Sequence, residues 1–183
     1  MIDQTLVQAF QQSLADEHRL RLYAVLDGAS IANLPTLLTE QQLPHVCLMP
    51  GELEPELAQA APYLVQLPAR SPFAGLFLTQ GVGSHWGILA TSAAGLRTLR
   101  MHLRALLSVW GPDGQPLFFR YYDPRVLRVY LPTCTAGELS TLFGPVSAYY
   151  AADESGEALL RFAVGATGLG QQRVTLARPV APA

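Results

Sequence analysis

Apolar and polar residues follow two different periods along this chain. The first segment, Gln4–His18, has apolar residues at three- and four-residue spacings with polar residues between them, which is typical of an amphipathic helix that covers a sheet. These apolar residues are Leu6, Val7, Phe10 and Leu14. The next segment, Arg21–Leu26, is a short apolar run closed by Asp27-Gly28. Such a run predicts a buried strand that ends in a turn.

The same two patterns recur up to residue 91. Asn33 and Ser71 each stand where a helix N-cap belongs, with a proline in the turn that follows, and acidic residues open the segment from Glu52. We therefore expect short helices at residues 34–42, 52–61 and 72–77, and strands at residues 45–49, 63–67 and 85–91.

A stripe of leucines at residues 96–107 marks one face of a helix that is expected to end before Gly111-Pro112. Three arginines, Arg97, Arg100 and Arg104, share the opposite face. This arginine face is either an ordinary solvated face or a strip that docks an acidic partner.

The remaining pattern predicts a strand, two helices and a hairpin. Asp113-Gly114 is a turn that leads into an aromatic strand. The final apolar runs flank a polar turn, which is typical of an antiparallel hairpin. The expected elements are a strand at 117–122, helices at 126–131 and 136–143, and hairpin strands at 146–152 and 158–164.

Strands separated by short helices predict an α/β fold, namely a layered mixed β-sheet with flanking helices and a C-terminal antiparallel hairpin. A chain of 183 residues can build one sizeable core, whereas two domains would each be small. We therefore expect one α/β domain at residues 1–165. Residues 166–183 are rich in Gly, Gln and Pro, which predicts a tail that is flexible or becomes ordered on a partner.

Composition narrows the possible partners. Half of the residues are apolar and only 14% are charged, against roughly 25% in typical soluble domains, so the folded chain can leave apolar surface for a partner. All 12 basic residues are arginines, they are scattered, and the net charge is -2. These features disfavour binding to nucleic acid or to an anionic membrane surface. The lack of lysine also excludes Walker A phosphate loops and Schiff-base chemistry.

Nothing in the sequence predicts secretion or membrane insertion. Residues 1–21 have no apolar run like that of a signal peptide, and no segment is long and apolar enough to span a bilayer. Cys47 and Cys134 lie 87 positions apart without neighbouring thiols, which favours buried thiols in a reducing compartment over a metal site. We expect a cytoplasmic protein without a metal ion or cofactor.

The motifs of common enzymes fit poorly. Residues 81–87, G-V-G-S-H-W-G, have the wrong glycine spacing for a dinucleotide loop and lead into a strand. Asp27 stands where some phosphatases carry a nucleophile, but their second aspartate is replaced by Ala29. The four histidines are isolated along the chain. A catalytic site assembled by folding from distant residues remains an alternative.

The most distinctive stretch is F-F-R-Y-Y-D-P-R-V-L at residues 118–127. Asp123 followed by Pro124 predicts an N-cap and the first residue of a helix. Arg120 lies in the apolar strand before it and needs a carboxylate partner. Asp27 also ends a strand, so we expect Asp27, Arg120 and Asp123 to cluster at one edge of the sheet, where Arg125 could join them. The cluster is an ion pair that fixes the corner, a recognition site for a partner peptide, or a catalytic site.

Four sequence blocks resemble the adaptor domain of bacterial type VI secretion. They are Y-A-V-L-D-G-A at 23–29, W-G-I-L at 86–89, H-L-R at 102–104 and F-R-Y-Y-D-P-R-V-L at 119–127. The last block is the specific part of a similarity that covers residues 20–143. Carried over residue by residue, the family's marks fall on Asp27, Gly28, Trp86, Gly87, Arg120, Tyr122, Asp123, Pro124 and Arg125.

The resemblance implies a chaperone-like protein that binds a toxic effector and loads it onto the spike protein. It implies partners of those two kinds and no catalytic residue, nucleic acid, membrane or small-molecule substrate. The residues 1–165 would then be an adaptor-like domain. Its partner-binding or structural cluster would comprise Asp27, Arg120, Tyr122, Asp123, Arg125 and Trp86.

Two other classes of function stay open. One is a small hydrolase or transferase whose site forms near Asp27 and Asp123, which predicts a deep pocket there with ionisable groups of shifted pKa. The other is an immunity-type protein, which would cover a toxin's active site and neutralise it. An adaptor would instead bind a targeting segment and leave the toxin active.

Overall fold

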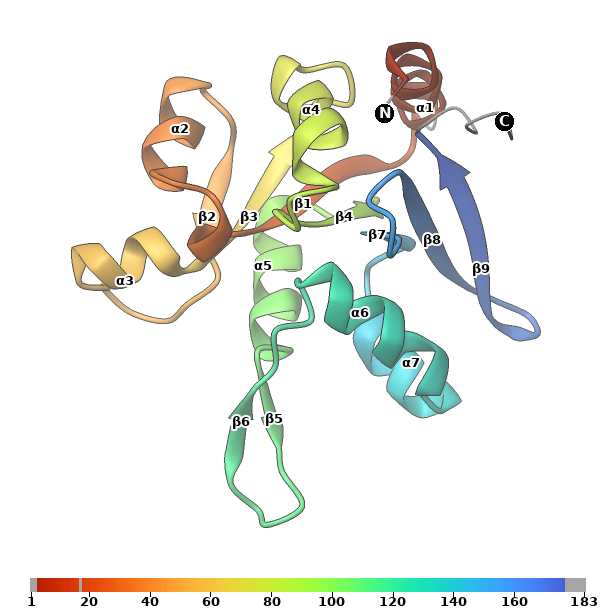
Figure 1. Cartoon of the computed structure of the whole chain (residues 1–183). Coiled ribbons are helices and arrows are strands. Elements are labelled where there is room, and N and C mark those ends of the chain that lie inside the picture. Colours follow the sequence, from red (N-terminus) through yellow and green to blue (C-terminus); the bar gives the residue numbers. More distant parts are fainter. Residues whose placement is uncertain (1–2, 17, 177–183) are drawn as a thin grey trace.

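The computed structural model describes residues 3–16 and 18–176. Its centre is a seven-stranded sheet in the order β2-β3-β1-β4-β7-β8-β9, in which every neighbouring pair is antiparallel (Figure 1). A separate two-stranded sheet pairs β5 with β6. The strands are β1 (Arg21–Asp27), β2 (His45–Cys47), β3 (Pro62–Leu67), β4 (Gly87–Ser92), β5 (Ser108–Trp110), β6 (Pro116–Phe118), β7 (Ala148–Ala152), β8 (Ala158–Gly165) and β9 (Gly168–Thr175).

Helices cover both faces of the large sheet (Figure 1). Helices α1, α2 and α4 contribute apolar side chains to the core on one face, and α5, α6 and α7 contribute to the core on the other. The helices are α1 (Gln4–Asp16), α2 (Leu34–Glu40), α3 (Pro55–Ala60), α4 (Pro72–Leu76), α5 (Leu96–Ala105), α6 (Pro124–Tyr130) and α7 (Ala136–Phe143). Short turns of other helix types lie at Gly28–Ser30, Phe77–Gly81 and Leu131–Thr133.

Strand β1 lies inside the sheet between β3 and β4, and its side chains are divided between the two cores. Leu22, Ala24 and Leu26 belong to the core beneath α1, α2 and α4. Tyr23 and Val25 belong to the core beneath α5, α6 and α7. Because successive side chains of a strand point to opposite faces, a run without polar positions fits a strand that is covered on both sides. This geometry explains the continuous apolar run in the sequence.

The structure confirms the layered α/β fold and the closing antiparallel hairpin, which is formed by β7 and β8. It also confirms Ser71 as the N-cap of α4, since its hydroxyl accepts a hydrogen bond from the Ala74 backbone N–H (3.2 Å). Asn33 precedes α2 but makes no capping hydrogen bond with its side chain. Its backbone is left-handed, with φ of 54°, a conformation that asparagine tolerates better than most residues.

The strand predicted at residues 117–122 is shorter than expected. Only Pro116–Phe118 forms a strand, β6, and it pairs with β5 rather than with the large sheet. Arg120 lies in the loop that follows, where the Asp123 N–H donates to its carbonyl (3.0 Å) and closes a turn. Tyr121 is buried, and its hydroxyl donates a hydrogen bond to the Leu103 carbonyl (2.9 Å). The aromatic run therefore has two parts: Leu117 and Phe118 pair with β5 and are exposed, whereas Tyr121 and Tyr122 are buried in the core to which α5 contributes.

The large sheet also continues beyond residue 165, where the sequence predicted a tail. Strand β9 pairs with β8 from Gly165↔Gly168 to Ala158↔Thr175. Residues 168–175 therefore belong to the sheet, and this corrects their assignment to the tail. Their polar composition suits an edge strand, which needs backbone pairing on one side but little apolar burial. The remainder of the predicted tail, residues 177–183, lies outside the described residues.

Both cysteines are free and only partly buried, whereas the sequence favoured buried thiols. Within the part of the chain that the structure describes, no helix is long and apolar enough to cross a membrane.

Candidate functional site

Asp27 ends strand β1, and hydrogen-bond donors surround its carboxylate, which is almost fully buried. Its Oδ1 accepts from the Ala29 backbone N–H (3.0 Å), and its Oδ2 accepts from the Ser30 hydroxyl (3.2 Å). These two bonds cap the short turn at Gly28–Ser30. Oδ2 also accepts from Nη2 of Arg120 (2.5 Å), 93 positions away in the sequence. A buried carboxylate is stable only with partners of this kind.

Arg120 lies at the surface, unlike its partner. Its side chain is 46% exposed, so it is not the buried strand arginine that the sequence suggested. Its guanidinium lies 5.8 Å from the centre of the Tyr122 ring, within the range of a cation–π contact. The pairing of Arg120 with Asp27, predicted from the sequence, is nevertheless present.

Asp123 is the N-cap of α6, and Pro124 follows it in the first helical turn, as predicted. Its Oδ1 accepts from the Arg125 backbone N–H (2.9 Å) and from Nε of the same residue (3.0 Å). Its Oδ2 accepts from Nη2 of Arg125 (2.7 Å). One arginine therefore holds both carboxylate oxygens, which fixes the direction in which α6 leaves the loop.

Five of the six residues predicted for the site lie together. We call Asp27, Arg120, Tyr122, Asp123 and Arg125 the aspartate–arginine cluster. Within it Arg120 acts electrostatically on both carboxylates and on Tyr122, and Asp27 acts on Arg125 as well. The cluster forms where the end of β1 meets the loop before α6.

Trp86 does not join the cluster through its side chain. Its indole packs on the opposite core, where an added Cβ at Gly81 would lie 2.7 Å from the ring. Only its backbone carbonyl reaches the site, by accepting from the Asp27 N–H (2.8 Å). Trp86 therefore supports β1 from the other side of the sheet.

The charges of the cluster shift the pKa values of its members. Burial alone would raise the pKa of Asp123, but the hydrogen bonds from the Arg125 side chain and backbone outweigh burial and hold the pKa below its ordinary value. Burial would lower the pKa of Arg120, but the carboxylate of Asp27 raises it instead. Burial is the main cause that raises the pKa of Tyr122, and the charge of Asp27 raises it further. These shifts favour the charged forms of Arg120 and Asp123 and the neutral form of Tyr122 at neutral pH.

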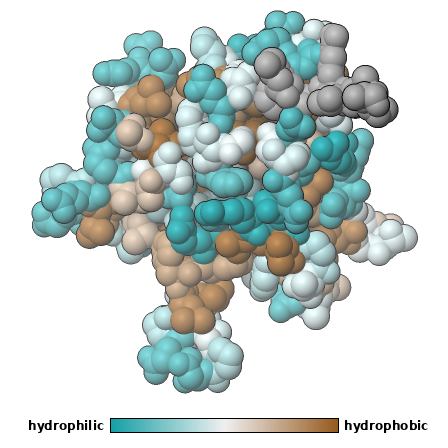
Figure 2. Space-filling model, in the orientation of Figure 1, coloured by the Kyte–Doolittle hydropathy of each residue, from teal (hydrophilic) through white to brown (hydrophobic). Residues whose placement is uncertain are grey.

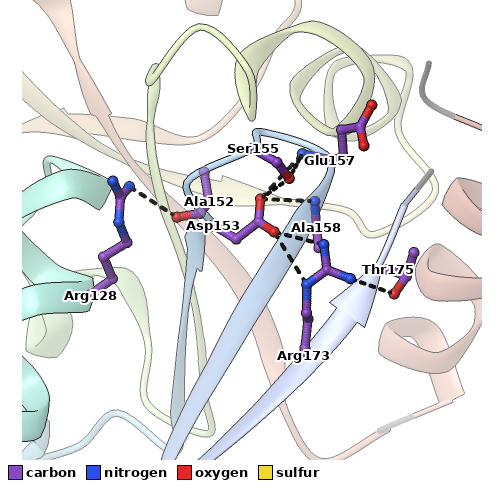
Figure 3. Close-up of polar contacts among 8 residues, drawn as sticks. All are labelled: Arg128, Ala152, Asp153, Ser155, Glu157, Ala158, Arg173 and Thr175. Atoms are coloured by element: carbon purple, nitrogen blue, oxygen red, sulfur yellow. Dashed lines mark hydrogen bonds and ion pairs between the residues drawn. The ribbon is translucent and has the colours of Figure 1, made fainter. Parts of the chain in front are cut away.

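The turn between β7 and β8 holds a second paired carboxylate, Asp153 (Figure 3). Its Oδ2 accepts from Nε (3.2 Å) and Nη2 (2.8 Å) of Arg173 in β9. Its Oδ1 accepts from the Ser155 hydroxyl (2.8 Å) and the Ala158 N–H (3.3 Å). The contacts fasten the turn to the edge strand. This pair was not predicted from the sequence, because Arg173 lies in the segment that was predicted to be a tail.

These two sites predict how stability depends on pH. Burial would raise the pKa of Asp153, but hydrogen bonds from Arg173 and Ser155 lower it, as Arg125 does for Asp123. A carboxyl whose pKa is lower in the folded state stabilises the fold fully above its unfolded pKa of about 4. This stabilisation is lost as the pH falls through the folded value.

We therefore expect the free energy of unfolding to decline below about pH 4, and to decline less steeply in Asp123→Asn and Asp153→Asn. Urea unfolding at stepped pH values measures the slopes. Asp113→Asn, in an exposed turn, is the matched control. Equal slopes in all four proteins would show that neither pair contributes to acid sensitivity.

The hairpin of β5 and β6 is a further candidate surface that the sequence did not reveal. It projects away from the body of the molecule (Figure 1), and three of its apolar residues are at least half exposed. These are Trp110 (77%), Leu117 (50%) and Phe118 (52%). Figure 2 shows apolar surface on the part of the hairpin next to the body and polar surface at its tip.

A surface hollow of about 500 Å³ lies beside α1, β1 and β3, with His18, Arg21 and Arg70 in its lining, but no member of the aspartate–arginine cluster lines it. Across residues 3–16 and 18–176, no three His, Cys, Asp or Glu side chains are placed to hold a metal ion. The exposed guanidiniums of Arg120 and Arg125 keep donors that could bind a partner's carboxylate or carbonyl groups.

Comparisons with known proteins place the chain in a family. No curated protein and no solved structure matches it. A family model described as Domain of unknown function (DUF4123) matches residues 22–141. The match runs from β1 into α7 and includes every member of the aspartate–arginine cluster. Because it covers more than half of the 183 residues, the chain belongs to the DUF4123 family.

Proposed function

We propose that this chain is a non-catalytic adaptor, or chaperone, that binds an effector protein of type VI secretion in the cytoplasm and helps to load it onto the spike protein. The observation that carries the proposal is the β5–β6 hairpin, which holds Trp110 and Phe118 in solvent outside the folded body. Exposed aromatic residues on a projecting element are typical of surfaces that recognise proteins, where such side chains act as anchors.

The choice of partner is supported by the sequence blocks that resemble type VI adaptors. The blocks at 23–29 and 119–127 supply the members of the aspartate–arginine cluster, and the block at 86–89 supplies the strand beside β1. A chain that carries these blocks therefore carries the residues that hold the loop before α6 against the end of β1. The hairpin leads directly into this corner, since Phe119 and Arg120 follow β6.

The cluster has a supporting role in this proposal. Its two carboxylates are buried and paired, whereas Arg120 and Arg125 are each about half exposed. Charged groups at the rim of an interface contribute more to specificity and association rate than to affinity. The hairpin would therefore anchor the effector, and the cluster would hold the hairpin's base and help to select the partner.

The test is co-purification from cells that express the tagged chain with the effector and the spike protein encoded by neighbouring genes. We expect the effector to co-purify with the chain and the spike protein to join through the effector. Circular dichroism of the chain alone establishes that it is folded. If neither protein co-purifies with folded chain, the adaptor proposal is wrong.

The same cells distinguish the adaptor from an immunity-type protein. An adaptor leaves the bound toxin active, so cells that express both proteins remain poisoned when the toxin reaches its target compartment. An immunity-type protein protects them. Protection that depends on a direct complex would replace the adaptor proposal by the immunity alternative.

A further inference from the structure

We propose that α5 and the β5–β6 hairpin together form a docking surface for an acidic, amphipathic segment of a protein partner. We call Arg97, Met101, Arg104, Trp110 and Phe118 the hairpin surface. That the partner is the effector rests on the proposed function. The chemistry of the docked segment rests on the hairpin surface alone.

The apolar part of this surface follows from the pairing of β5 with β6. Ser108 pairs with Phe118, and Trp110 pairs with Pro116. Paired residues in an antiparallel ladder share a face, as do residues two positions apart. Trp110 and Phe118 therefore lie on the same face of the hairpin, and all four of these residues are exposed. One whole face of the ribbon is left without a covering element in the described structure.

The charged part lies on α5, which ends three residues before the hairpin begins. Arg97, Met101 and Arg104 follow one another at helical spacings of four and three residues, and all three are exposed. The leucines on the opposite side of the helix, Leu99 and Leu103, are fully buried. The exposed face therefore combines two arginines with an apolar side chain that is 69% exposed.

Positive charge predominates in this part of the chain. Residues 96–118 contain three arginines and a single acidic residue, Asp113, which lies in the hairpin turn and accepts from the Gln115 N–H (3.1 Å). None of the three arginines has an ion-pair partner among the described residues. Nε of Arg100 is buried there without a hydrogen bond. Unpaired arginines on α5, together with exposed aromatic residues on the hairpin that follows it in the chain, are complementary to a segment with carboxylates on one face and apolar side chains on the other.

A protein segment fits this surface better than a nucleic acid or a membrane. The chain has a net charge of -2 and no lysine, whereas sequence-independent binding of phosphate backbones and anionic lipids depends on many clustered cations. Two or three arginines are enough to orient a peptide, and Trp with Arg is the usual composition of interface anchors.

The test uses a synthetic amphipathic helical peptide that carries leucines on one face and glutamates on the other, labelled for fluorescence anisotropy. A matched peptide has lysines in place of the glutamates. We expect the acidic peptide to bind wild type and the basic one not to bind. Trp110→Ser and Phe118→Ser should each weaken binding by about 30-fold, as expected for an interface anchor. Arg97→Glu with Arg104→Glu should weaken it by about tenfold, and added salt should weaken wild-type binding.

Matched controls lie on other parts of the surface. Leu57→Ser removes an apolar side chain that is 60% exposed on α3, and Arg19→Glu reverses an exposed arginine before β1. Both should bind the acidic peptide as wild type does. All altered residues are exposed, and thermal unfolding establishes that each variant is folded. Equal binding of both peptides, or equal binding by wild type and the Trp110→Ser variant, would overturn the proposal.

Three further outcomes would also overturn it. The first two are stronger binding of wild type to a single-stranded oligothymidine, or to phosphatidylglycerol vesicles, than to the acidic peptide. The third is an oligomer of the free chain that the Trp110→Ser substitution dissociates. The surface would then be occupied by a second copy of the chain, whose acidic segment is Glu52–Leu57. Sedimentation velocity measures this last case.

Two combinations of results distinguish a failure of the docking surface from a failure of the proposed function. If the effector co-purifies equally with wild type and with Trp110→Ser, the adaptor proposal stands and the hairpin surface is not the docking site. If the acidic peptide binds as expected but the effector never co-purifies, the docking surface stands and its partner is another acidic protein.

Discussion

Replacing Gly87 by alanine is expected to lower the free energy of unfolding by more than about 4 kcal/mol, which would leave little folded protein. Gly87 opens β4 with φ of 149°, a backbone conformation that residues with a side chain rarely adopt. A Cβ added there would lie 2.0 Å from the Val25 carbonyl oxygen and 3.0 Å from Cα of Leu26. Both are backbone atoms of the central strand β1, which cannot move without disturbing its pairing with β3 and β4.

Chemical denaturation of Gly87→Ala and Gly137→Ala measures the effect against a matched control. Gly137 lies in α7 with no heavy atom within 4 Å of its added Cβ. Alanine there should be neutral or stabilise the protein by up to about 1 kcal/mol. A Gly87→Ala protein that unfolds within about 1 kcal/mol of wild type would show that β1 and β4 can separate to admit a side chain.

Replacing Asp27 by alanine is expected to cost about 2–4 kcal/mol of unfolding free energy. The change removes the cap of the Gly28–Ser30 turn and leaves the Ala29 N–H and the Ser30 hydroxyl without their acceptor. It also removes the carboxylate that pairs with Arg120. Asp113→Ala, which alters an exposed turn aspartate, should cost less than about 1 kcal/mol and serves as the control.

A double-mutant cycle of Asp27→Ala and Arg120→Ala measures the ion pair itself. We expect a coupling free energy of about 1–2 kcal/mol, because one partner is buried and the other is half exposed. Coupling near zero would mean that Asp27 acts only as the cap of its own turn.

The Arg120→Ala variant also decides what the aspartate–arginine cluster does. If this variant is folded and still co-purifies with the effector, the cluster fixes the strand–helix corner and takes no part in recognition. If it is folded and loses the effector, Arg120 belongs to the binding surface. The side chain of Arg120 is exposed enough to do either.

Close backbone packing explains why glycine stands at positions 28 and 87, two of the positions that the resemblance marks. An added Cβ at Gly28 would lie 2.3 Å from the Gln59 carbonyl oxygen and 2.5 Å from that of Ala61. The two glycines flank Asp27, one next to it in the chain and the other beginning the neighbouring strand. Close backbone approach on both sides therefore holds the end of β1 where Asp27 can reach Arg120.

Features that depend on neighbours along the chain could be predicted without the structure. Period and capping signals predicted α1, β1, α7 and the β7–β8 hairpin, and Asp123-Pro124 predicted the start of α6. Helices and strands bury faces with different periods, and caps satisfy backbone groups of the same turn. The pairing of Asp27 with Arg120 was predicted on a further argument, that a cation beside apolar residues needs a carboxylate.

Features that depend on contacts between distant segments became visible only in the folded chain. Leu117 and Phe118 lie in an exposed strand, whereas the neighbouring aromatic residues Tyr121 and Tyr122 are buried. Trp86 packs in the core on the other face of the sheet from the cluster. Arg173 in β9 forms an ion pair with Asp153 in the turn before β8. Burial and pairing of this kind depend on contacts between residues far apart in the chain. A local pattern carries no information about which distant segment will cover it, and so the exposed hairpin emerged only from the fold.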